Sequence, residues 1–157
     1  CGELFKSMAR ISIVHVPYKG GPPASAATIG GEVSMLFNTV GSVHPSIKSG
    51  RLRALGVTTS GRSGVLPDVP TMAEAGLPGF ELQSWFGLLA PAATPKPIIS
   101  RLNAETIKAL NTLEMKSAVA TMGANVMSGS PEQFADYIKS EIARIGEIVK
   151  AAGIKVE

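Results

Sequence analysis

The sequence has one cysteine, few charged residues and no long apolar run. Cys1 alone cannot form an intrachain disulfide, so cysteine usage says little about the redox compartment. Hydrophobic residues make up 45% and charged residues 17% of the 157 positions, a balance that argues against disorder. No apolar stretch approaches the roughly 20 residues that a membrane-spanning helix needs. The chain is long enough for one domain of ordinary size with a hydrophobic core.

The common signatures of catalysis are also missing. The sequence contains no G-x-S-x-G, H-E-x-x-H or S-x-x-K motif and no Walker A loop. The two histidines lie far apart and the cysteine is terminal, so no metal site is expected. Asp68 and Glu74 are close in sequence, but a helix-capping role already accounts for Glu74. We therefore predict a protein that is not an enzyme and that needs no cofactor.

The charge is mildly positive and dispersed. The net charge is +3, and the tightest basic group is Lys48, Arg51 and Arg53. A nucleic-acid-binding protein usually gathers its basic residues into a stripe with interleaved aromatic residues. The scattered pattern therefore predicts no nucleic-acid partner, and it is compatible with a small anionic ligand.

Strand-like and helix-like segments alternate in the first part of the chain. Apolar runs predict strands over residues 11–16, 33–37 and 52–58, and the segments between them predict helices over 2–9, 24–29 and 40–49. Short connections of this kind imply an α/β fold with a parallel sheet covered on both faces. In such sheets, ligands lie beyond the carboxyl ends of the strands. The turns at residues 18–23 and 38–41 fall there.

The rest of the chain is predicted to be irregular and then mainly helical. In the Gly- and Pro-rich residues 59–84, Thr71 and Glu74 make a capping box for a short helix. A strand is expected over residues 85–90, followed by a helix capped by Thr94, a shorter helix and a last helix opened by Ser130. The last helix carries an apolar stripe of Phe134, Ile138, Ile142, Ile145 and Val149. This half has apolar faces but little of its own to bury them against.

The two turns offer backbone donors rather than reactive side chains. A helix N-terminus presents unpaired N–H groups and the positive end of a dipole, which together favour an anion. Gly20 and Gly21 allow close approach because they have no Cβ. The two prolines that follow have no N–H, so Ala24 and Ser25 are expected to be the first free donors.

Several motifs follow one known family in order and spacing. They are VPYKGG, GG-x-V at residues 30–33, SGRLRALGVT, LPDVPTMAEAGLPGFE and WFGLLAPAATPKPII. Through them the chain resembles the Bug family, the extracytoplasmic solute-binding proteins of tripartite tricarboxylate transporters. The resemblance implies a two-lobed, type II periplasmic-binding-protein fold that closes over a small carboxylate. It covers the whole chain but only the C-terminal half of the family.

The resemblance also implies a domain organisation, a site and partners. Residues 1–84 would form one nearly complete lobe, a parallel sheet flanked by helices, and residues 85–157 the crossover strand and C-terminal helices of an incomplete other lobe. Ligand contacts would fall on Tyr18, Lys19, Gly20, Gly21, Asn38 and Thr39, to which the helix N-terminus adds Ala24 and Ser25. The ligand would be a mono-, di- or tricarboxylate, the partners the transporter's membrane permease subunits, and the location the periplasm. An alternative is an extracytoplasmic sensor that uses the same lobe to signal ligand to a membrane partner.

Two positions depart from the family pattern, and some candidates have ordinary alternatives. Pro22 stands where the family usually has Gly or another small residue, and it removes one N–H. Ser34 stands where Asp is common, a change that concerns a structural hydrogen bond. Lys19 also fits a solvated charge, Tyr18 a packing residue, and Trp85 core or inter-lobe packing. The paired glycines also fit a turn that needs them without binding anything.

The start of the chain has two interpretations. Cys1-Gly2 fits the lipidated end of a processed lipoprotein, or the place where a longer chain was cut. The helix-like GELFKSMAR begins without a capping residue, which favours the second. The signal peptide and the N-terminal half of the family are then expected to be absent from this chain.

Overall fold

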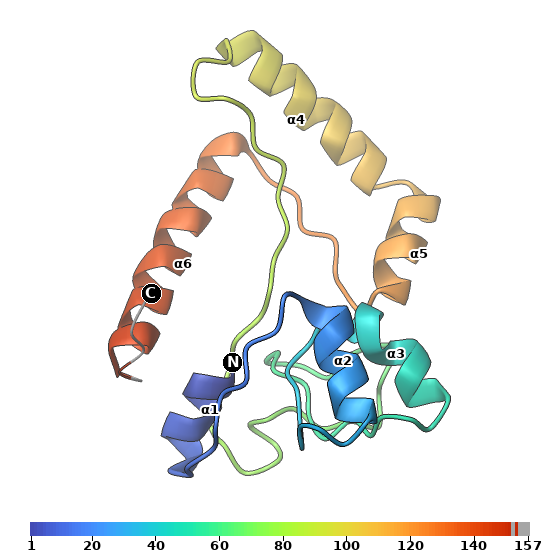
Figure 1. Cartoon of the computed structure of the whole chain (residues 1–157). Coiled ribbons are helices and arrows are strands. Elements are labelled where there is room, and N and C mark those ends of the chain that lie inside the picture. The colour runs from blue at the N-terminus through green and yellow to red at the C-terminus, as the bar shows by residue number, and fades with distance from the viewer. Residues whose placement is uncertain (152, 154–157) are drawn as a thin grey trace. The chain divides into compact units, whose positions relative to one another are not determined.

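A computed structural model of the chain (Figure 1) describes residues 1–151 and 153. The described residues contain the helices α1 (Gly2–Ala9), α2 (Gly21–Ile29), α3 (Val40–Lys48), α4 (Lys96–Leu110), α5 (Leu113–Thr121) and α6 (Pro131–Ala151). The chain divides into two compact units. Unit 1 comprises Cys1–Ser84 and Thr121–Gly123, and unit 2 comprises Trp85–Ala120 and Ala124–Glu157.

Several helix ends follow signals that the sequence carries. Gly50 follows α3 at φ 73° and Gly123 follows α5 at φ 70°, a left-handed conformation that glycine adopts without steric cost. At the start of α6, the Ser130 N–H donates to Gln133 Oε1 (2.8 Å) and the Gln133 N–H donates to Ser130 Oγ (3.2 Å). This reciprocal cap confirms the predicted start of the last helix.

Two helix starts differ from the prediction. α2 begins at Gly21 rather than at Ala24, because proline fits the first turn of a helix, where no N–H is needed. α4 begins at Lys96, and its N-cap is Pro95. Thr94 was expected to cap this helix, but no side-chain cap forms there, and the Thr94 N–H donates to a carbonyl in the preceding turn (2.9 Å).

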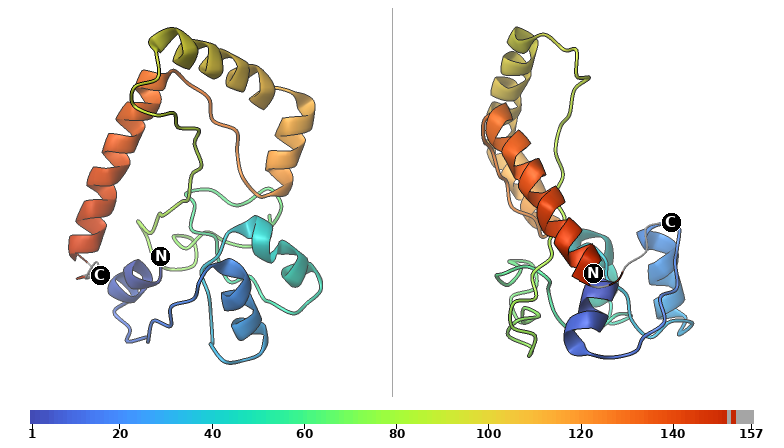
Figure 2. Two further views of the ribbon diagram at one scale, coloured as in Figure 1. Left: turned by 45° about the horizontal axis from the view of Figure 1, so that its top comes forward. Right: turned by 90° about the vertical axis from the view of Figure 1, so that its left-hand side faces the viewer.

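The predicted parallel sheet does not form among the described residues. The segments 11–16, 33–37, 52–58 and 85–90 run between helices without a strand ladder (Figures 1 and 2), and only the isolated pairings Val57–Thr71 and Ser63–Leu66 occur. A strand needs a neighbour at about 4.8 Å that exchanges N–H and C=O groups with it. Apolar side chains along these segments remain exposed, 89% for Val14 and 65% for Leu55. The prediction of strands and of a parallel sheet is therefore wrong for these residues.

Unit 1 contains the buried side chains of the described residues. They are Ala27, Val57, Thr71 and Phe80. The Val57 N–H donates to the Pro70 carbonyl and the Met72 N–H donates to the Val57 carbonyl, both at 2.9 Å. Phe80 exposes only 1% of its surface. The segments near residues 57, 71 and 80 therefore form the small core of this unit.

The predicted capping box of Thr71 and Glu74 forms beside this core. The Thr71 N–H donates to Glu74 Oε2 (2.9 Å), and the Glu74 N–H donates to Thr71 Oγ1 (3.1 Å). It stands at the start of a run of turns over residues 72–76, where a helix was predicted. Arg62 Nε also donates to Glu74 Oε2 (2.9 Å). The Thr71 N–H and the Arg62 guanidinium lower the pKa of Glu74 below its usual 4.5.

We expect the stabilising effect of Glu74 to disappear in acid. Its pKa is lower in the folded chain than in the unfolded chain, so the contribution is complete above about pH 4.5 and is lost as the pH falls through the lowered pKa. The melting temperatures of the wild type and Glu74→Gln should therefore differ at neutral pH and converge in acid. Asp68→Asn, which removes an exposed carboxylate from the same loop, is the control. A difference that does not change with pH would contradict this account.

Unit 2 is organised around aromatic contacts with α6. The Trp85 ring meets the rings of Phe134 (centroids 5.6 Å apart) and Tyr137 (5.7 Å) edge-on. α4 packs against α6, and Asn103 Nδ2 donates to the Gly129 carbonyl (2.9 Å). None of the described side chains of this unit is buried. The apolar stripe of α6 therefore has little covering within the unit, as its sequence indicated.

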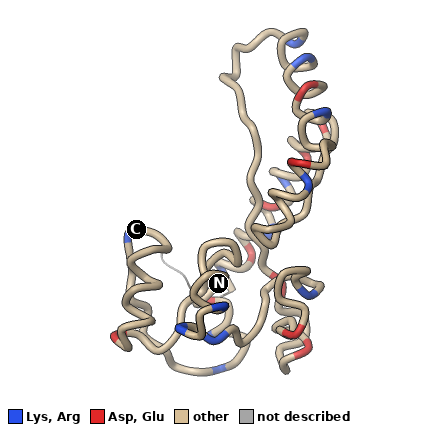
Figure 3. The backbone as a smooth tube through the Cα atoms, turned by 90° about the vertical axis from the view of Figure 1, so that its right-hand side faces the viewer, with Lys and Arg blue, Asp and Glu red and all other residues tan. Residues whose placement is uncertain are grey.

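Charges of both signs interleave along the helices (Figure 3). Lys108 pairs with Glu105 (2.8 Å) and Lys139 with Asp136 (3.3 Å), each three residues apart on one helix face. Exposed pairs of this kind contribute about 0–1 kcal/mol each. Within the described residues, no helix is long and apolar enough to cross a membrane.

Candidate functional site

The two predicted turns lie side by side in unit 1. α2 follows one turn and α3 follows the other, and these helices are neighbours (Figure 1). The Asn38 side chain joins them: its Nδ2 donates to Ser25 Oγ (3.1 Å) and, more weakly, to the Gly21 carbonyl (3.4 Å). Residues 13 and 17 positions apart in the sequence are thus brought together.

The paired glycines have different roles. Gly20 is the N-cap of α2 and has φ 108°, a conformation that disfavours residues with a Cβ. A Cβ built on Gly20 would meet nothing within 4 Å, so this side of the turn is open. A Cβ built on Gly21 would lie 2.9 Å from both Asn38 Nδ2 and Asn38 Oδ1. Gly20 serves the backbone bend, and Gly21 makes room for the Asn38 amide.

The turn before α3 is held by hydroxyl and amide groups. The Thr39 N–H donates to Asn38 Oδ1 (2.8 Å), and Ser42 Oγ lies 2.9 Å from the same oxygen as a donor. Ser42 Oγ is also within 2.9 Å of the Thr39 carbonyl and of Thr39 Oγ1. Sequence reasoning missed Ser42. A serine in the first turn of a helix, three residues after the threonine N-cap, is the signal that could have found it.

The unpaired backbone donors are not those that were expected. Because α2 begins at Gly21, Ala24 is its fourth residue, whose N–H faces the carbonyl of Gly20 in helix geometry. The Gly20 N–H donates to the Tyr18 carbonyl (2.9 Å). In the described residues, the N–H of Gly21 has no acceptor. The same holds at the start of α3 for Val40 and Gly41.

The site offers neutral donors at two helix N-termini. Each N-terminus stabilises an anion by about 0.3–1 kcal/mol when exposed. Ser25 Oγ accepts from Asn38, so its own hydroxyl proton remains available for another acceptor. Tyr18 is half-buried and Lys19 is exposed beside the turn. This arrangement can hold a carboxylate, and it contains no nucleophile with an adjacent base.

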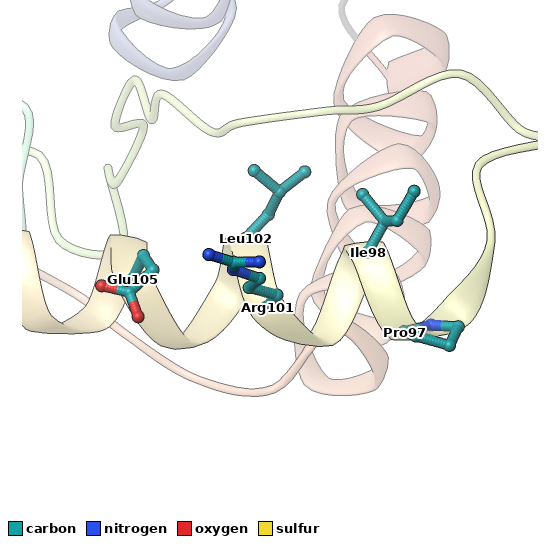
Figure 4. Close-up of a pocket in the computed structure, with 5 residues that line it drawn as sticks. All are labelled: Pro97, Ile98, Arg101, Leu102 and Glu105. Carbon is teal, nitrogen blue, oxygen red and sulfur yellow. The ribbon is translucent and has the colours of Figure 1, made fainter.

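Two grooves in unit 2 do not combine donors from two helix N-termini. One, of about 400 Å³, lies on α4 (Figure 4), where Ile98 and Leu102 point to the same side and Arg101 and Glu105 flank them. The other, of about 440 Å³, is lined by Trp85 and the apolar stripe of α6. Their only side-chain N–H donors are those of Arg101 in the first groove and Trp85 in the second, and neither lining contains a hydroxyl group. No group of three or more metal-binding side chains occurs among the described residues. The junction of the two turns is therefore the candidate site.

Comparison with known protein sequences finds a family model and related proteins. A sequence model described as the tripartite tricarboxylate transporter family receptor (TctC) matches residues 1–154. The chain is 42% identical over 147 residues to the UPF0065 protein in the tcbD-tcbE intergenic region of Pseudomonas sp. strain P51. It is 37% identical over 155 residues to protein BugT of Bordetella pertussis. These matches cover 93% and 99% of this chain but 44% and 48% of the relatives, so the chain spans about half their length.

Several solved structures have a backbone that follows the same path as this chain. R. palustris Rpa4515 with adipate matches at a TM-score of 0.92 and 36% identity, over 97% of this chain and 51% of that chain. A periplasmic transporter matches at 0.91 and 36% identity, over 99% and 52%. MatC from Rhodopseudomonas palustris with bound malate matches at 0.80 and 34% identity, over 93% and 51%. The fold is thus that of type II periplasmic binding proteins over half of their length.

Proposed function

The chain belongs to the tripartite tricarboxylate transporter receptor family, and we propose that it is the part of a solute-binding protein that captures a small carboxylate for delivery to the membrane transporter. The family is one of binding proteins, which confirms the prediction that the chain is not an enzyme. We also propose that the protein works in the periplasm, as its relatives do, with the transporter's permease subunits as partners.

The ligand class rests on the relatives and on the candidate site together. Rpa4515 was solved with adipate and MatC with malate, both dicarboxylates. The unpaired N–H groups of Gly21, Val40 and Gly41 supply donors of the kind that a carboxylate oxygen accepts. The free Ser25 hydroxyl proton adds another. We assign one carboxylate of the ligand to this junction, with Tyr18, Lys19, Gly20 and Thr39 at its rim.

The division into units supports a two-lobed organisation. We propose that residues 1–84 supply the ligand-binding lobe and that residues 85–157 pack on a further segment of the full-length receptor. The chain exposes 11361 Å². Two fully separate compact bodies, each of half its mass, would expose about 9000 Å². Unit 2 contributes apolar side chains to this surface, among them Phe86, Leu88 and Leu89, which are all exposed.

Calorimetry tests this function directly. We expect a full-length receptor that carries this sequence to bind adipate or malate, and the 157-residue chain alone to bind the same acid at least about 100-fold more weakly, because half of the contacts are absent. The corresponding diamide is the matched control, since it keeps the carbon chain but removes both negative charges. It should not bind measurably.

Two results would contradict the proposal. One is a folded full-length receptor that binds none of a panel of mono-, di- and tricarboxylates. The other is equal affinity for the acid and its diamide, which would show that the donors do not recognise a carboxylate.

A further inference from the structure

Both amide hydrogens of the Asn38 side chain have acceptors inside the protein. Its amide nitrogen donates to Ser25 Oγ and to the Gly21 carbonyl, and its amide oxygen accepts from the Thr39 N–H and from Ser42 Oγ. An asparagine amide has two donor hydrogens, and both have partners here, while its oxygen can only accept, so the side chain has no donor left for a carboxylate. We propose that Asn38 is a positioning residue that holds the two turns at a fixed separation. This inference rests on the proposed function of the same junction.

The hydrogen bonds from Asn38 to α2 are not needed to form the turn before α3. The N-cap of α3 is Thr39, and no side-chain cap hydrogen bond forms at this helix. Asn38 precedes the cap, and its amide nitrogen reaches to a different helix. A role confined to the start of α3 would use only the amide oxygen, through Thr39 and Ser42. The donations to α2 are therefore the part of the arrangement that a local role leaves unexplained.

Gly21 leaves the space that the Asn38 side chain occupies. A Cβ on Gly21 would lie 2.9 Å from both polar atoms of the amide, so glycine is needed there if Asn38 is to stay in place. The N–H groups proposed to hold the carboxylate belong to Gly21 on one turn and to Val40 and Gly41 on the other. Their separation depends on how α2 and α3 are joined. Ligand donors on separate helices bind one anion well only if that separation is fixed beforehand.

The assignment revises the role expected for Asn38 from sequence. Ligand affinity should depend on Asn38 through Ser25 and Gly21, not through a contact of its own. This distinction can be measured, because residues that act as one unit give non-additive effects in a double-mutant cycle.

The test measures dissociation constants by calorimetry in the full-length receptor, with adipate and malate as ligands. We expect Asn38→Ala to weaken binding by about tenfold, the order of one lost hydrogen bond. Ser25→Ala should weaken binding less, and the double variant should bind about as well as Asn38→Ala alone.

Asn38→Asp keeps the volume of the side chain and loses the two amide donations, so it replaces Asn38→Ala if that variant does not fold. Asn103→Ala is the control: it also removes an amide that joins two segments, and it should leave the dissociation constant within twofold.

The outcomes distinguish a failure of the proposed function from a failure of the positioning role of Asn38. If the wild type binds neither ligand nor any other carboxylate, the proposed function is wrong and the positioning role falls with it. If the wild type binds and the Asn38 variants bind within twofold of it, the positioning role alone is wrong. If the effects of Asn38→Ala and Ser25→Ala multiply, Ser25 acts independently of Asn38, which also overturns the role.

Discussion

Replacing Phe80 by alanine should remove about 3–5 kcal/mol from the free energy of unfolding, as is typical when a fully buried aromatic site is emptied. Phe80 is the most completely buried large side chain among the described residues, with 1% of its surface exposed. A domain has only about 5–15 kcal/mol of stability in total. The variant should therefore unfold at a much lower urea concentration with an unchanged slope, measured by circular dichroism of the full-length receptor.

The matched control is the same substitution at Phe86, which is 86% exposed. In the 157-residue chain, Phe86→Ala should change the stability by less than about 0.5 kcal/mol. In the full-length receptor it should cost about 1.5–3 kcal/mol if a further segment covers unit 2, because the ring is then buried. Equal, small effects in both proteins would contradict the proposed covering of unit 2. A small effect of Phe80→Ala would contradict the assigned core.

Replacing Gly21 by valine should weaken carboxylate binding by about tenfold or more. The sequence already suggested that a side chain there would block the approach of a ligand to the backbone. The structure adds a second cause, because the new Cβ would lie 2.9 Å from the Asn38 amide and displace it. Both causes act on the same N–H groups, so affinity should fall for every carboxylate tested. Calorimetry on the full-length receptor measures the change.

Gly61→Val is the control for that variant. A Cβ on Gly61 meets nothing within 4 Å, and the residue does not have a positive φ. It belongs to the same unit, so it tests whether any valine in unit 1 disturbs binding. Unchanged affinity in Gly21→Val would show that the paired glycines do not belong to the ligand site.

Local features of the fold could be predicted because neighbouring residues determine them. Gly50 and Gly123 follow helices, and Ser130 opens α6, through contacts within a few positions of each other. The Thr71–Glu74 cap was predicted for the same reason, although the helix after it was not formed. Family membership was predicted from motifs that span the chain, and the family model over residues 1–154 confirms it.

The site could be predicted only in part. The turns at Gly20-Gly21 and Asn38-Thr39 were named from their place in the pattern and from the resemblance. The start of α2 was placed at Ala24, and the donors were misplaced with it, because the sequence did not show that both prolines would join the first turn. Ser42 was missed because its partner Asn38 is recognisable only once the turn is folded.

What the sequence alone determined is local: where most helices start and stop, which segments are apolar, and which family the motifs belong to. The tertiary structure decided which residues meet. It left the expected strands without ladders, because a ladder depends on the spacing of a neighbouring segment. It also brought the Asn38 amide together with partners from two helices, and this depends on positions in space that no run of neighbouring residues encodes.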